Sequence, residues 1–151
     1  MARLLIVHHT VSPATWELLE AVLDGARDDE IEGVEIVSRP ALAASVSDAL
    51  TADAVVLGTP ANIGYMSGAL KHWFDLVHYP ALSSGRTVPY TLYAHGNDDT
   101  TGAVRAVEAI TKGMGWVRHR PPVTVEGAPT AADRDACREL GAVTALAALG
   151  M

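Results

Sequence analysis

The chain of 151 residues has the length of one domain and buries about two-thirds of its unfolded surface, enough for a core of its own. Its 18 acidic and 11 basic side chains give a net charge of -7, which argues against nucleic acid and anionic membrane surfaces as partners. No apolar run approaches the roughly 20 residues that span a bilayer, and we expect no signal peptide at the start. The single cysteine, Cys137, excludes an intramolecular disulfide and favours a reducing cytoplasm. We therefore expect a single cytoplasmic domain over residues 1–151.

Short apolar runs alternate with helical patterns along the whole chain. In chain order, strands are expected at 4–8, 33–38, 54–58, 88–95 and 123–126. Helices are expected from Ser12-Pro13 to Ala26, over 41–50, from Ser67 to Val77, over 103–114 and after Thr130. The pattern is a strand followed by a helix, repeated five times, which predicts an α/β fold with a parallel sheet and helices on both faces.

Two segments carry this prediction most clearly. The run 54–58 is continuously apolar, as expected of a central parallel strand covered on both faces. After Ser67, Leu70, Trp73, Phe74 and Val77 recur at helical spacing. In such sheets ligands bind beyond the carboxyl ends of the strands, so the loops 10–15, 59–66 and 95–102 are the candidate site.

The first of these loops carries three hydroxyl groups, from Thr10, Ser12 and Thr15. Together with backbone N–H groups at a helix start, these hydroxyls can surround a phosphate without help from Lys or Arg. The alternative is that Ser12 only caps the helix and the threonines are solvated. Pro13 removes one N–H donor from the loop.

Two motifs resemble the flavodoxin family. Thr10-x-Ser12-Pro13-x-Thr15 resembles its phosphate motif [T/S]-x-[T/S]-G-x-T, with Pro13 in the place of glycine. The segment 52–71, ADAVVLGTPANIGYMSGALK, resembles a segment of flavodoxins and of flavodoxin-like NAD(P)H:quinone and FMN reductases. The resemblance implies a three-layer flavodoxin-like fold, with a five-stranded parallel sheet in order 2-1-3-4-5, and bound FMN.

The same resemblance assigns residues to the flavin. It implies that Thr10, Ser12 and Thr15 bind the FMN phosphate and that the loop after the third strand lies along the isoalloxazine ring. The ring residues are Pro60, Ala61, Asn62, Ile63 and Gly64. Gly64 adopts a positive φ cheaply, so a peptide beside it is free to rotate toward the flavin, or it forms only a tight turn. Tyr65 either stacks on the ring or covers the next helix.

The third loop lacks the aromatic residue that usually covers the flavin in single-electron flavodoxins, since none occurs between Tyr93 and Trp116. Backbone groups of Gly96 and Asn97 are expected at the pyrimidine edge. His95 lies over or beside the ring, or is a partly exposed histidine at a strand end. One flavin face is then open to a substrate.

The leading interpretation is an FMN-dependent oxidoreductase that passes electrons from NAD(P)H to a quinone or similar small acceptor. The donor rests on the resemblance alone, no catalytic side chain stands out, and no metal site is expected. One alternative is a non-enzymatic electron carrier that the charge of -7 steers to a basic redox protein. Another is an interaction module on the same fold without flavin. By analogy with related reductases, a homo-oligomer is left open.

Overall fold

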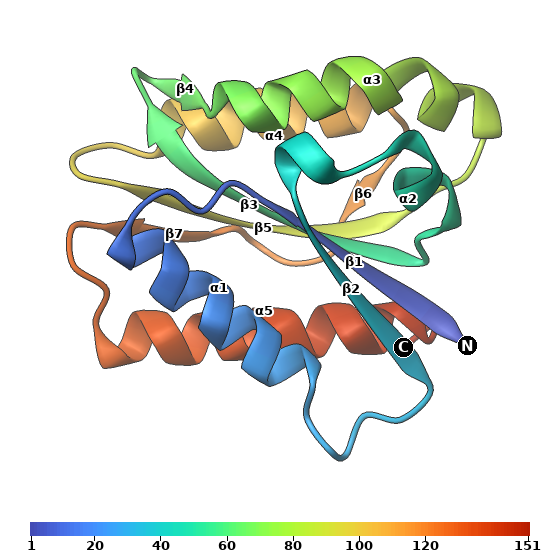
Figure 1. The fold of residues 1–151 in the computed structure, drawn as a ribbon, viewed down its shortest axis with the longest axis horizontal. Helices are drawn as coiled ribbons and strands as arrows, with labels where there is room; N and C mark the ends of the chain where they lie inside the picture. Colours follow the sequence, from blue (N-terminus) through green and yellow to red (C-terminus); the bar gives the residue numbers. More distant parts are fainter.

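The computed structural model describes residues 1–151 as three layers, with a central sheet between two layers of helices (Figure 1). The parallel strands occur in the order β2-β1-β3-β5-β6, and β7 also pairs with β5. Their bounds are β1 Ala2–His8, β2 Val34–Pro40, β3 Ala54–Asn62, β5 Pro89–Gly96, β6 Val117–Arg118 and β7 Val123–Glu126. The expected α/β fold with the order 2-1-3-4-5 is thus confirmed, with β6 and β7 together in the place of the fifth strand.

Each face of the sheet is covered by its own set of helices. α1 (Pro13–Ala26) and α5 (Ala131–Ala148) cover one face, and α2 (Val46–Thr51), α3 (Gly68–Ser84) and α4 (Thr101–Gly113) cover the other (Figure 1). Alternate strand residues point to opposite faces, so Leu4 and Ile6 join one apolar cluster while Leu5 and Val7 join the other. None of the helices combines the length and the apolar composition that crossing a bilayer requires.

Three local features differ from the expectations. The helix expected over 41–50 is a 3-10 turn at Ala41–Ala43 followed by the short α2, whose N-terminus is capped by Ser45 and Asp48. The fifth strand is interrupted at Pro121-Pro122, because proline has no N–H to donate to a strand ladder. The third strand does not end at Gly58 but continues to Asn62 and turns back as β4 (Tyr65–Met66), which pairs antiparallel with it.

Helices α1 and α5 approach each other unusually closely. A Cβ atom on Gly25 would lie 1.8 Å from the carbonyl oxygen of Arg138, and one on Gly141 would lie 2.0 Å from that of Val22. Only glycine fits at these two contacts. The first helix, which begins at the candidate phosphate loop, is therefore fixed in place by the last helix.

Candidate functional site

The first loop forms a capping box at the start of α1. Ser12 Oγ accepts a hydrogen bond from Thr15 N at 3.1 Å, and Thr15 Oγ1 accepts from Ser12 N at 3.0 Å and from Val11 N at 3.1 Å. Thr15 is buried, and its hydroxyl donates to the Ser12 carbonyl at 3.1 Å. The hydroxyls of Ser12 and Thr15 lie 2.9 Å apart, and Thr15 is as much a part of the helix cap as Ser12.

Thr10 completes this loop through a contact with the end of β1. Its hydroxyl lies 2.8 Å from Nδ1 of His8, a residue that is 8% exposed. Burial, with a smaller contribution from the neighbouring His9, lowers the pKa of His8 below its usual value of 6.5. The imidazole is therefore neutral at pH 7, so the donors of this loop are uncharged. The positive end of the α1 dipole is the electrostatic attraction that remains for an anion.

The second loop is a β-hairpin between β3 and β4. Its two turn residues, Ile63 and Gly64, have φ values of +51° and +74°. Positive φ at both central residues is the geometry of a type I′ turn, which normally selects Asn, Asp or Gly. For an L-residue such as Ile63 the left-handed conformation costs about 1–2 kcal/mol. Gly64 supplies the second positive φ without that cost.

The hairpin is fixed against the start of α4. A Cβ atom on Gly102 would lie 1.9 Å from the carbonyl oxygen of Gly64, so the two backbones are in direct contact. At the base of the hairpin, Ser67 N donates to Thr59 Oγ1 at 3.0 Å, and that hydroxyl donates to the Pro60 carbonyl at 2.7 Å. The Gly64 carbonyl is therefore not free to rotate unless α4 moves.

The third loop is tied to the loop that follows β7. His95 Nε2 donates to the Gly127 carbonyl at 2.8 Å, and Gly127 N donates to the Gly96 carbonyl at 2.9 Å. Because a carbonyl only accepts, the Nε2 atom of His95 carries a proton in this contact. His95 is 8% exposed, so the expectation of a partly exposed strand-end histidine is wrong.

A pocket at the carboxyl edge brings part of the predicted site together. It is lined by Ser12, Pro13, Ala14, Glu17, His95, Asn97, Gly127, Ala128 and Pro129. The first and third loops thus share one pocket, as expected. The sequence prediction missed the contribution of 127–129, although the loop after the fifth strand also lies at the carboxyl edge.

The hairpin residues Pro60 to Tyr65 are not part of this pocket. Asn62, Ile63 and Gly64 are exposed at the hairpin tip. Tyr65 lies on β4 and is 42% exposed. Both interpretations of Tyr65, stacking on the ring or covering the next helix, stay predictions.

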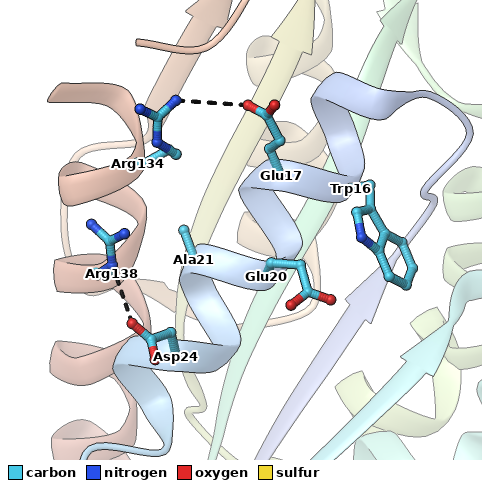
Figure 2. Close-up of a pocket in the computed structure, with 7 residues that line it drawn as sticks. All are labelled: Trp16, Glu17, Glu20, Ala21, Asp24, Arg134 and Arg138. Atoms are coloured by element: carbon cyan, nitrogen blue, oxygen red, sulfur yellow. Dashed lines mark hydrogen bonds and ion pairs between the residues drawn. The ribbon is translucent and has the colours of Figure 1, made fainter. Parts of the chain in front are cut away.

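A second hollow lies between α1 and α5 and shares Glu17 with the pocket at the carboxyl edge (Figure 2). Across it, Arg134 points to Glu17 at 3.8 Å and Arg138 to Asp24 at 3.1 Å. The ion pairs satisfy these charges, and the hollow has no hydroxyl groups. It is a surface groove between paired helices, not a second phosphate site. The structure also holds no cluster of three or more His, Cys, Asp or Glu side chains placed for a metal ion.

Comparison with solved structures defines the class of fold. A flavodoxin from the domain Archaea superposes with a TM-score of 0.80, at 17% identity over 97% of this chain and 99% of that chain. A WrbA-like flavodoxin from Agrobacterium tumefaciens gives 0.78, at 17% identity over 99% of both chains. The flavodiiron protein of Giardia intestinalis gives 0.83 at 16% identity, where this chain covers 37% of the longer protein. The fold is flavodoxin-like.

Sequence comparison supports the same family. A segment of 75 residues is 33% identical to a flavodoxin of Aquifex aeolicus (strain VF5), and it covers half of this chain and 40% of that protein. No family model matches the chain. The predicted resemblance to flavodoxins is confirmed. The matched segment spans less than half the length of that relative.

Proposed function

We propose that residues 1–151 form a single flavodoxin-like domain that binds FMN at the carboxyl edge of its sheet. The observation that carries the proposal is the pocket in which the hydroxyl-bearing start of α1 meets the third loop. Ser12 and the start of α1 supply the part of this pocket that fits a phosphate, at the positive end of the helix. Thr10 and Thr15 do not line the pocket, and their hydroxyls are bonded to His8 and Ser12, so these bonds would have to open for the two to bind the phosphate. Ala14, the second helical residue, has no intrahelical acceptor for its N–H by position.

The same proposal assigns the remaining contacts. Gly96 and Asn97 would contact the pyrimidine edge, and the hairpin from Pro60 to Gly64 would lie along the ring. His95 would position the third loop through its bond to Gly127. Gly96 and Asn97 supply backbone N–H donors, which are uncharged. The first charged side chain after them is Asp98.

We further propose that the protein is an oxidoreductase with NAD(P)H as donor and a quinone or similar small molecule as acceptor. Bound FMN would supply the hydride-accepting and electron-passing chemistry. In the net reaction NAD(P)H loses a hydride, and the quinone gains those two electrons, that proton and one proton from solvent to become a quinol. The third loop supports this proposal, because it has no aromatic side chain to cover the ring.

Two measurements test these proposals in order. The visible absorption spectrum of purified protein after incubation with FMN and gel filtration should show protein-bound flavin. The FMN-loaded protein should then oxidise NADH or NADPH with a quinone, without other proteins, faster than free FMN does. No retained flavin refutes the first proposal. Retained flavin without turnover refutes the second.

The distribution of charge favours one other function, a carrier that serves a basic redox protein. Between residues 17 and 35 the chain has eight carboxylates and one basic residue, Arg27. Such a surface steers a basic partner and loses its effect as salt rises. A carrier would transfer electrons from a reductase protein at a rate that falls steeply with ionic strength. It would show no direct turnover with NAD(P)H and quinone.

A further inference from the structure

A groove lies between α4 and the edge strand β7, on the face of the sheet that α2, α3 and α4 cover (Figure 1). Its volume is about 630 Å³, against about 360 Å³ for the pocket at the carboxyl edge, and the two share no lining residue. Ligand pockets in proteins usually measure about 300–1,000 Å³. The groove therefore has room for a small ligand at a place that the proposed FMN site does not use.

The alternation of side chains on β7 explains why the groove is polar. Val123 and Val125 pack with the apolar cluster under α1 and α5. Thr124 and Glu126 consequently point to the opposite face and line the groove beside α4. Strands of a sheet that is covered on both faces are normally apolar on both. β7 instead presents a hydroxyl and a carboxylate, where apolar side chains would close the groove against the helix.

Helix α4 supplies the other wall of the groove. Its buried side carries Ala103, Val107 and Thr111. Arg105 and Lys112 lie on the side that lines the groove, seven residues apart, which is two helical turns or a rise of about 10 Å. Two cations at this spacing suit an extended ligand with charge along its length better than one small anion.

Arg105 and Lys112 also lack a carboxylate partner. Seven of the eleven basic side chains form ion pairs, in a chain with 18 carboxylates. Glu108, which lies between the two cations on α4, is paired with Arg118 at 3.1 Å, whereas Glu126 has no basic partner. The groove therefore holds two free positive charges and one free carboxylate.

We propose that this groove is a nucleotide-binding site. Arg105 and Lys112 bind phosphate oxygens, for which their charged donors are suited. Glu126 accepts hydrogen bonds from ribose hydroxyls, as carboxylates do in dinucleotide-binding folds. A ligand that carries only phosphate is repelled by Glu126, whereas a ribose beside the phosphate makes the same carboxylate a favourable contact. The hydroxyl of Thr124 adds a neutral donor.

This site goes beyond the proposed function and does not depend on FMN. Its ligand is either the adenosine half of the NAD(P)H donor or a free nucleotide, because the two share a ribose with phosphate groups. The probe for both is ADP.

The test measures ADP binding by isothermal titration calorimetry at low ionic strength, with and without saturating FMN. The variants are Arg105→Gln, Lys112→Gln and Glu126→Ala. Arg27→Gln is the matched control, because Arg27 is also exposed and without a carboxylate partner but follows α1, outside the groove. Pyrophosphate is titrated in parallel, since it has the phosphate groups of ADP and no ribose. The melting temperature of each variant checks that the fold is intact.

We expect Arg105→Gln and Lys112→Gln each to weaken ADP binding about three- to tenfold, as loss of one exposed charged contact predicts. Arg27→Gln should stay within about twofold of the wild type. Glu126→Ala should favour pyrophosphate over ADP by about threefold or more, because only ADP loses a ribose contact. ADP binding should persist in saturating FMN.

Kinetics of the FMN-loaded protein distinguish the two sources of the nucleotide. If the ligand is the donor, ADP competes with NAD(P)H, and Arg105→Gln raises the KM for NAD(P)H by the factor that it raises the Kd for ADP. If the ligand is a free nucleotide, the KM for NAD(P)H stays at its wild-type value while ADP binding weakens. Either result supports the site.

Three results would overturn the inference. The first is no binding of ADP to the wild type at about 1 mM. The second is an equal loss of affinity in Arg27→Gln and Arg105→Gln, which would show only the effect of net charge. The third is displacement of ADP by FMN, which would place the nucleotide in the pocket at the carboxyl edge. Failure to retain FMN would refute the proposed function alone, since ADP binding is measured on the flavin-free protein as well.

Discussion

Gly102→Ala should disturb the candidate site through one atom. The added Cβ would lie 1.9 Å from the Gly64 carbonyl oxygen, whereas ordinary contacts begin at 3.4 Å. Both groups are backbone, so either the hairpin tip or the start of α4 has to move. Overpacking of this kind costs about 1–3 kcal/mol, and the better helix propensity of alanine returns up to about 1 kcal/mol. We expect a net loss of about 1–2 kcal/mol, or a melting temperature lower by roughly 2–8 °C.

Thermal unfolding and FMN titration of Gly102→Ala would check this expectation. The displaced hairpin should also weaken FMN binding, since its residues are proposed to lie along the ring. Gly68→Ala is the matched control, because Gly68 begins α3 and a Cβ there meets nothing within 4 Å. Wild-type melting temperature and FMN affinity in Gly102→Ala would show that the contact with Gly64 is not tight and that α4 does not fix the hairpin.

Three further predictions concern other parts of the molecule. Thr15→Val removes the acceptor of two N–H groups, so we expect a stability loss of about 1–3 kcal/mol, and FMN affinity reduced at least roughly tenfold more than riboflavin affinity. Equal losses for the two flavins would show that this loop does not bind the phosphate. Because burial lowers the pKa of His8 from 6.5, the unfolded state binds more protons, and stability present above about pH 6.5 is lost below it. Melting should therefore depend more on pH between 7.5 and 5.5 in wild type than in His8→Asn, and identical pH profiles would contradict this. Burial raises the pKa of Cys137 to about 12, so iodoacetamide at pH 8 should label the thiol only in urea, and rapid labelling of the folded protein would refute its burial.

The sequence predicted the parts of the fold that depend on burial. The apolar run 54–58 is central in the sheet, and Leu70, Trp73 and Phe74 are buried on α3. In each case the spacing of apolar residues reports directly which side meets the core. The short strand β6 was not predicted, although Pro121-Pro122 marks the interruption between it and β7.

The candidate site was harder to predict, because its geometry depends on contacts between loops. The hairpin was expected as a loop since Ile63 is a poor residue for a type I′ turn, and only Gly64 signalled it. The bond between His95 and Gly127 joins residues 32 positions apart, which no local pattern reveals. The capping role of Thr15 is a local feature, but its sequence is equally compatible with a phosphate loop.

The close packing of α1 on α5 also affects how the chain folds while it is being synthesised. α1 ends at Ala26 and α5 begins at Ala131, so the ribosome adds more than one hundred residues between the two. At about 5–20 residues per second, α1 waits roughly 5–20 s for its partner. During this time the apolar side of α1, including Leu18 and Val22, cannot complete its packing. Until α5 is synthesised, this apolar side of α1 is one of the transiently exposed surfaces that make a folding chain prone to aggregation.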